Sequence, residues 1–306
     1  MPLSADGSLQ IDPALLQRLT GIELQSRYLV RGLYNSRHRT ADFGSSTEFI
    51  EHREYRRGDE LRSIDWRVFG RTDRFFVKVH EMEANMRVHL LLDTSASMRV
   101  PPPPGLPSKL ELACVIAGAI ATMVQAQQDA VGLCCIGDRI EEQIPARQGG
   151  AHLAQLFQRL AAPRGRGGGR FGRLLLDAAP QLGSRGLVFV LTDALDSPDD
   201  LATALHHLRL REQDATLIHI MDRNEIEFPF DQMTEFRHPE TNLRLIGDPA
   251  GLRAKYLERL AAFRTRIADI CQATQTDLLF LHNADDLVKL LAAHFIRRLL
   301  EGAGSC

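Results

Sequence analysis

The chain has 306 residues, 44% of them apolar and 25% charged, and its formal net charge is −2. These values are typical of a globular protein of one large or two modest domains, and they exclude a whole-chain electrostatic attraction to nucleic acid. The five cysteines are odd in number and irregularly spaced, which argues against a disulfide framework and favours a reduced, cytoplasmic setting.

Residues 1–84 are expected to form an N-terminal part that differs from the rest of the chain. The opening MPLSADGSLQIDPALLQ lacks the basic and apolar regions of a signal peptide, and residues 9–35 have a helical pattern with Asp12 and Pro13 at its start. Residues 36–80 are rich in Arg, Gly and aromatics, which favours a loop-rich segment with one or two short strands. The single Trp, Trp66, is expected to be a core anchor.

Residues 85–303 are predicted to form one α/β domain with a doubly wound, mostly parallel sheet. Apolar strands alternate with helices, and their continuous apolar runs indicate burial on both faces. Strands are predicted at 88–92, 130–137, 186–193, 215–222 and 276–282, with a hairpin partner at 138–145. Helices are predicted at 109–127, 151–161, 172–181, 199–211, 249–273 and 284–301, and residues 223–248 are expected to be an excursion that contains a strand.

The apolar segment LACVIAGAIATMVQA, within the first of these helices, is predicted to be a buried helix. It is shorter than the roughly 18 uncharged apolar residues that a membrane helix needs. We therefore expect no membrane insertion.

Oxygen-bearing side chains follow two of the predicted strands. In VHLLLDTSASM, Asp93, Thr94, Ser95 and Ser97 come after an apolar strand, and the strand GLVFVLTD ends in Asp193. In such sheets ligands bind beyond the carboxyl ends of the strands, so these oxygens converge if the two strands are neighbours. Asp93, Ser95, Ser97 and Asp193 would then suit Mg²⁺ or Mn²⁺ rather than Zn²⁺. Helix capping and turn formation by the same residues remain the structural alternative.

These residues carry a family resemblance. LLLDTSASM and the later VFVLTDALD resemble a von Willebrand factor A domain, and the first stretch resembles its metal-ion-dependent adhesion site (MIDAS). The upstream block resembles the signature of the DUF58 family (domain of unknown function), and its matching residues are Arg53, Tyr55, Gly58, Asp59, Arg62, Ile64, Asp65 and Trp66. The resemblance implies a non-enzymatic adaptor that works with a MoxR-type AAA+ ATPase on an unknown client protein.

One position departs from the family pattern. The resemblance implies a metal-binding Thr in the loop GRGGGRFGRLL, where Arg170 or Phe171 stands in this chain. We expect the Arg170 guanidinium to weaken metal binding, or to replace the cation by pairing with Asp93 or Asp193. The loop lacks the Lys-Ser/Thr ending of a P-loop, so a flexible site loop is favoured over phosphate or RNA binding.

Partner contacts are assigned to Arg170 and Thr94, and to Asp59, Arg62 and Asp65 of the upstream block. Arg and aromatic residues favour binding hot spots, but the same block is also explained by Asp–Arg pairs that fix it structurally. The rival function is a metal-dependent phosphatase or hydrolase with Asp93 as nucleophile. It is disfavoured because Ser95 stands where such enzymes carry a second Asp as general acid.

Overall fold

The computed structural model describes residues 51–55, 66–72, 74–79, 86–163, 167, 170–241, 243–291 and 293–294. The described residues fall into two compact units, one within residues 38–85 and one that begins at Met86. The predicted helix at 9–35 lies outside the described residues, as do Asp59, Arg62 and Asp65.

The smaller unit contains a two-stranded antiparallel sheet and one short helix. Strand β1 (Glu51–Glu54) pairs with β2 (Phe76–Val79), and α2 (Trp66–Thr72) lies between them in sequence. Phe69 stacks on Phe75 with ring centroids 4.5 Å apart. The short strands predicted in residues 36–80 are therefore present, whereas the predicted anchoring role of Trp66 concerns a side chain outside the described ones.

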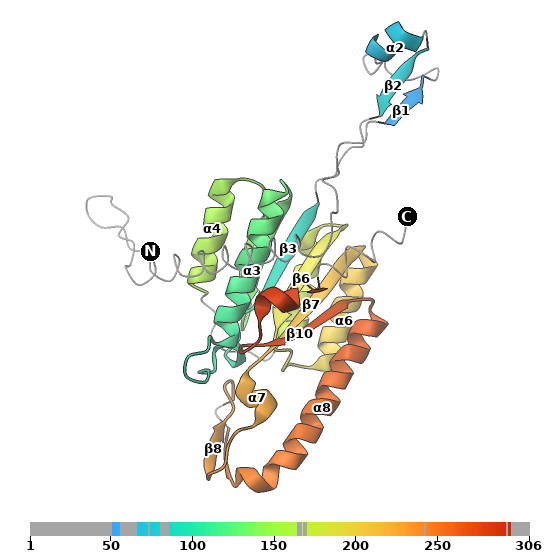
Figure 1. Ribbon diagram of the computed structural model, residues 1–306. Helices are drawn as coiled ribbons and strands as arrows, with labels where there is room; N and C mark the ends of the chain where they lie inside the picture. Colours follow the sequence, from blue (N-terminus) through green and yellow to red (C-terminus); the bar gives the residue numbers. More distant parts are fainter. Residues whose placement is uncertain are drawn as a thin grey trace, which may run out of the picture. The chain divides into compact units, whose positions relative to one another are not determined.

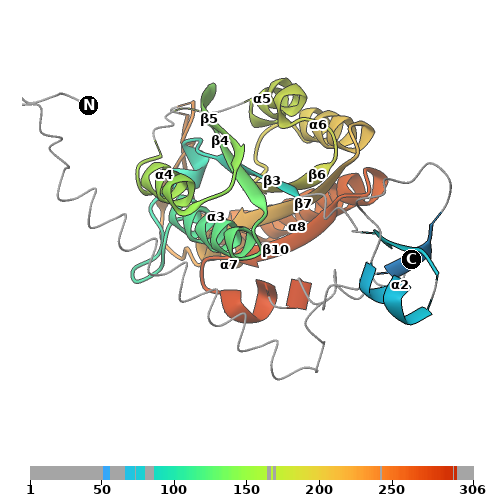
Figure 2. The ribbon, with the colours of Figure 1, turned by 90° about the horizontal axis from the view of Figure 1, so that it is seen from above.

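The larger unit is built on a six-stranded sheet with the order β10-β7-β6-β3-β4-β5. All neighbouring strands are parallel except β5, which runs antiparallel to β4 at one edge (Figures 1 and 2). The strands are β3 (Arg87–Asp93), β4 (Ala130–Ile136), β5 (Ile140–Arg147), β6 (Gly186–Thr192), β7 (Gln213–Met221) and β10 (Asp277–His282). The doubly wound, mostly parallel α/β fold and the predicted β4–β5 hairpin are confirmed.

Helices cover both faces of this sheet, as the continuous apolar strands require. The helices are α3 (Lys109–Ala126), α4 (Gly150–Ala161), α5 (Phe171–Ala178), α6 (Pro198–Leu210) and α8 (Pro249–Ala273), with a short helix η3 (Ala179–Leu182) after α5. One core lies under α3 and α4 and the other under α5, α6 and α8. Of the predicted helix at 284–301, residues 287–291 and 293–294 are helical, and residues 292 and 295–301 lie outside the described residues.

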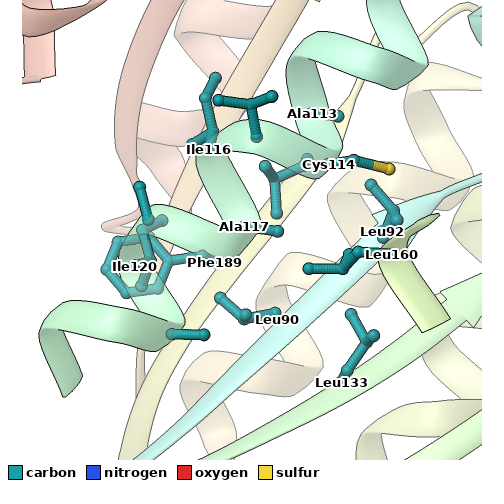
Figure 3. Packing of buried hydrophobic residues seen from close by; sticks show 14 of the residues in the cluster. Leu90, Leu92, Ala113, Cys114, Ile116, Ala117, Ile120, Leu133, Leu160 and Phe189 are labelled. Atoms are coloured by element: carbon teal, nitrogen blue, oxygen red, sulfur yellow. The ribbon is translucent and has the colours of Figure 1, made fainter. Parts of the chain in front are cut away.

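Alternate residues of β3 serve the two cores. Leu90 and Leu92 pack against the α3 side, where Ile116 and Ala117 lie (Figure 3), whereas Leu91 belongs to the core under α5 and α6. This alternation follows from the period of two along a strand.

Helix α3 is long and apolar enough to cross a membrane by length and composition, and 72% of its 18 residues are buried within this unit. It begins with a capping box, in which the Ser108 hydroxyl accepts from the Glu111 amide. Four cysteines are buried free thiols, as predicted from their apolar surroundings: Cys114, Cys134, Cys135 and Cys271. Burial raises the pKa of the Cys134 and Cys271 thiols to about 12, which makes both unreactive near neutral pH.

The predicted excursion at 223–248 consists of α7 (Arg223–Glu227) and a hairpin of β8 (Thr234–Arg237) and β9 (Arg244–Gly247). An aromatic cluster anchors it: Phe228 stacks on Phe236 at 5.7 Å and on Tyr256 of α8 at 4.6 Å between ring centroids. Figure 1 shows α7, β8 and the first turns of α8 together beyond one end of the sheet. Because α7 follows β7 directly, this is the end where the parallel strands terminate.

Candidate functional site

The carboxyl ends of β3 and β6 lie side by side. The two strands are parallel neighbours, with Leu92 paired to Leu191, so the next residues, Asp93 and Thr192, are adjacent. The Thr192 hydroxyl donates a hydrogen bond to Asp93 Oδ2 at 2.6 Å. The structure therefore brings the two predicted oxygen-rich strand ends together.

A tight turn after β3 gathers the first set of oxygens. The Ser95 amide donates to Asp93 Oδ1 at 2.9 Å, and the hydroxyl oxygens of Ser95 and Ser97 lie 3.0 Å apart. All three side chains are buried, and Ser97 begins a short 3-10 helix, η2 (Ser97–Arg99). The local spacing Asp-x-Ser-x-Ser thus directs residues 93, 95 and 97 to one place.

The carboxyl group of Asp93 is poorly compensated in charge. Burial and, to a lesser extent, the nearby charge of Asp193 raise its pKa to about 7, against the opposing hydrogen bonds from Thr192 and Ser95. Within the described part of the chain, its side-chain hydrogen bonds come from neutral donors rather than from cations. Near neutral pH, Asp93 therefore holds a proton part of the time unless a cation comes close.

The cation beside Asp193 is Lys109, the first residue of α3. Its ammonium donates to Asp193 Oδ2 at 2.8 Å and to Glu225 Oε1 at 2.6 Å. Sequence reasoning missed this residue, although it is the single basic side chain in α3 and stands at the helix end nearest the strand termini. It lies 84 positions from Asp193 and 116 from Glu225, so no local pattern connects the three.

Two further groups fix this ion pair in place. Glu225 Oε2 accepts from the Asp222 amide at 2.7 Å as part of the capping box of α7, so the carboxylate is held by the helix start. The ring of His219 lies against the Asp193 carbonyl, with Nε2 at 2.8 Å from the oxygen. Burial lowers the pKa of His219 to about 4, so this imidazole is neutral and adds no second cation.

The predicted contact residues Thr94 and Arg170 lie in different settings. Thr94 is fully buried and its hydroxyl donates to Glu141, which in turn pairs with Arg159 at 2.7 Å. The Thr94 side chain is therefore hydrogen-bonded inside the protein and is not exposed to a partner. Arg170 is exposed at the start of α5. The Gly167 carbonyl accepts from the Ala96 amide at 2.8 Å, so the Gly/Arg loop does lie against the serine turn.

The donor set fits a divalent cation only in part. Adjacent ligands of an octahedral Mg²⁺ are roughly 3.0 Å apart at the usual bond lengths, which matches the spacing of the Ser95 and Ser97 oxygens. Asp193, however, is paired with an internal ammonium, and Arg170 or Phe171 stands where the resemblance implies a Thr. No group of three or more His, Cys, Asp and Glu with metal-binding spacing occurs in the described part of the chain. Magnesium or manganese at this site stays a prediction.

The chain is similar to one described protein family and to several proteins that belong to bacteria. The family described as "Protein of unknown function DUF58" matches residues 51–266, more than half of the chain. Uncharacterized proteins of Mycobacterium tuberculosis and Mycobacterium bovis are each 25% identical over 281 residues, which is 90% of this chain and 87% of theirs.

Solved structures give weaker similarities. BatB from Bacteroides thetaiotaomicron has a TM-score of 0.44 and 14% identity, with 69% of this chain and 98% of that chain covered. An aerotolerance-related membrane protein from Bacteroides fragilis has a TM-score of 0.45 and 14% identity, with 71% and 99% covered. The SpRpn10 VWA domain has a TM-score of 0.40 and 14% identity, with 66% and 91% covered.

The sheet and the family match support each other. The order β10-β7-β6-β3-β4-β5, with the antiparallel strand at the edge, is a mostly parallel α/β sheet of the kind that the resemblance implied. The DUF58 match begins at Glu51, within the smaller unit, and continues through most of α8. The chain therefore belongs to the DUF58 family of proteins of unknown function.

Proposed function

We propose that this chain is a non-enzymatic interaction module, an adaptor that links a MoxR-type AAA+ ATPase to a client protein in the cytoplasm. The ATPase comes from the family resemblance. The interaction role rests on an observation of this chain: an apolar surface on the β8–β9 hairpin, at the same end of the sheet as Asp93 and Asp193.

The apolar surface consists of four large side chains of the hairpin that face solvent. Their exposed fractions are 69% for Met233, 68% for Leu243, 59% for Leu245 and 69% for Ile246. Because neighbouring residues of a strand point to opposite sides, Leu245 and Ile246 expose apolar groups on both faces of the hairpin. Large apolar groups exposed this close together are typical of a protein-interaction site. Packing of Phe236, on β8, against Phe228 of the aromatic cluster holds the hairpin against the rest of the larger unit, and we call this hairpin the platform.

The hairpin turn also lies within electrostatic reach of the strand-end site. Burial raises the pKa of Glu240, in the turn between β8 and β9, and the charges of Asp193 and Asp196 raise it further. Leu195, two residues after Asp193, adds another exposed apolar side chain. A partner that covers the hairpin would therefore reach the rim of the oxygen-rich site.

The same geometry disfavours the enzyme. An aspartyl nucleophile must be ionised and open to its substrate, whereas Asp93 is buried, has a pKa raised to about 7 and has both oxygens engaged by donors. The position of the general acid is held by Ser95, whose hydroxyl contacts Ser97. Nothing in this arrangement favours phosphoryl or acyl transfer over binding.

The test is direct binding between the purified chain and a purified MoxR-type ATPase by biolayer interferometry. The double variant Leu245→Asp/Ile246→Asp should weaken binding at least tenfold, because each change places a charge in the apolar surface. Leu210→Asp is the matched control: Leu210 is 66% exposed at the opposite end of the sheet, as the last residue of α6, and its change should leave affinity unchanged.

Three results would overturn the proposal. The first is the absence of ATPase binding. The second is equal binding by the hairpin variant and the wild type when both melt alike by circular dichroism. The third is hydrolysis of a generic phosphate ester that Asp93→Ala abolishes, which would support the phosphatase instead.

A further inference from the structure

We propose that the Lys109 ammonium is the resident cation of the strand-end site, so that Asp193 is neutralised from within the chain and the site does not depend on a divalent metal. The inference concerns the same site as the proposed function but needs no partner. It goes beyond the family resemblance, which implies a metal-completed site.

The first support is the geometry of the ion pair. The side chains of Lys109 and Asp193 are 1% and 3% exposed, and their charged atoms are 2.8 Å apart. A buried ammonium is stable only when it is paired, and here a second carboxylate, Glu225, completes the pairing at 2.6 Å. The other oxygen of Asp193 accepts from the Leu195 amide at 3.2 Å, so both of its oxygens are in use.

The second support is the position of Lys109 on its helix. A cation in the first turn of a helix meets the positive end of the helix dipole, which disfavours it. Lys109 is the first residue of α3, directly after the capping residue Ser108. Because the helix start itself opposes a positive charge there, the two carboxylates must account for the placement of the ammonium.

The third support is the effect of this charge on a metal ion. A divalent cation on Asp93, Ser95 and Ser97 would lie near the ammonium, because Asp93 accepts a hydrogen bond from Thr192, the residue before Asp193, and Asp193 in turn pairs with Lys109. Like charges at short range in a buried site repel strongly. The Thr that the resemblance implies as a metal ligand is also absent, so the metal would lack one ligand. Asp193 would not replace that ligand, because it is already paired with Lys109.

The ammonium also connects elements that are far apart in the sequence. Through Glu225 it ties α3 and the end of β6 to α7, and the Tyr256 hydroxyl of α8 donates to the Glu225 carbonyl at 2.8 Å. A metal ion could neutralise Asp193, but it would not supply the link that Lys109 makes to α7. The internal cation thus joins the strand-end site to the base of the hairpin platform.

The experiment is a titration of the full chain with Mn²⁺, followed by the electron paramagnetic resonance signal of free Mn²⁺ and carried out without any partner. Five proteins are compared: wild type, Asp93→Asn, Lys109→Gln, Lys109→Gln/Asp93→Asn, and Lys255→Gln as a control that removes an exposed lysine of α8. Wild type and the control should show no binding that depends on Asp93. Lys109→Gln should bind Mn²⁺ at least tenfold more tightly, and the added Asp93→Asn should abolish that gain.

Each outcome decides the matter. Wild-type Mn²⁺ binding that Asp93→Asn removes would overturn the proposal, whether or not the lysine variants fold. A folded Lys109→Gln protein with no gain in binding would also overturn it, because Lys109 would then be a structural anchor only. If Lys109→Gln does not fold, the wild-type titration decides alone. None of these results depends on binding to the ATPase, so the inference and the proposed function fail independently.

Discussion

Replacing Lys109 by Met is expected to destabilise the larger unit strongly. The change keeps an unbranched side chain only one atom shorter but leaves Asp193 as a buried carboxylate without its cation, next to the second carboxylate of Asp93. Removal of one partner of a buried ion pair typically costs about 3–5 kcal/mol. Glu225 adds little to this figure because its side chain is 26% exposed and can be solvated.

The assay is urea unfolding followed by circular dichroism at pH 7, with thermal melting as a second readout. A loss of about 3–5 kcal/mol corresponds to a fall in Tm of about 6–20 °C for a unit of this size. The matched comparison is Arg266→Ala, which breaks an ion pair with Asp199 in which both side chains are exposed. Such pairs contribute about 0–1 kcal/mol.

A second variant tests the reasoning behind the first. Lys109→Met/Asp193→Asn removes both charges, so the penalty of an unpaired buried carboxylate disappears and part of the stability should return. The reasoning is refuted if the free energy of unfolding of Lys109→Met is within about 1 kcal/mol of that of the wild type. It is also refuted if the double variant is less stable than Lys109→Met alone, because the ion pair would then not stabilise the fold as expected.

Three further predictions follow from burial and close contact. Leu90→Ala should lower the free energy of unfolding by about 2–5 kcal/mol in urea titrations because Leu90 fills the core under α3, whereas Leu210→Ala on the surface should change it by less than about 0.5 kcal/mol. Gly172→Ala should cost roughly 1–3 kcal/mol, since a new Cβ would lie 2.7 Å from the backbone carbon of Asp200, and an unchanged melting temperature would contradict the tight α5–α6 contact. The pKa of His219 is lowered to about 4 in the folded state, so between pH 6.5 and 4 the unfolded state binds a proton that the folded state does not. The contribution of the neutral imidazole to the free energy of unfolding is therefore complete above pH 6.5 and falls by roughly 3 kcal/mol as the pH decreases through that window. Equilibrium unfolding from pH 7.5 to 4 should show a shallower loss in His219→Gln, and an identical pH dependence in both proteins would refute the assignment.

Local patterns predicted the elements that depend on short-range information. The apolar run within residues 109–127 was enough to predict α3, whose observed bounds differ from the prediction by one residue at its end. The turn after β3 was equally accessible, because Asp93, Ser95 and Ser97 lie within five positions and the backbone turn alone directs them together. Continuous apolar strands alternating with helices were enough to predict a parallel sheet covered on both faces.

What the sequence by itself determined was therefore the fold class, the order of its elements and the oxygen-rich turn, all of which follow from spacing over a few residues. Only the tertiary structure decided which cation lies beside Asp193. The prediction considered Arg170, in the loop where the family pattern has Thr, but the ammonium that is present comes from Lys109, 84 positions away. Long-range pairing of charges depends on which strand ends and helix starts the sheet order brings together. Local patterns in one sequence do not show which distant residues become neighbours in this way. The same reason applies to Thr94, whose partner Glu141 lies 47 positions further on and holds the hydroxyl inside the fold.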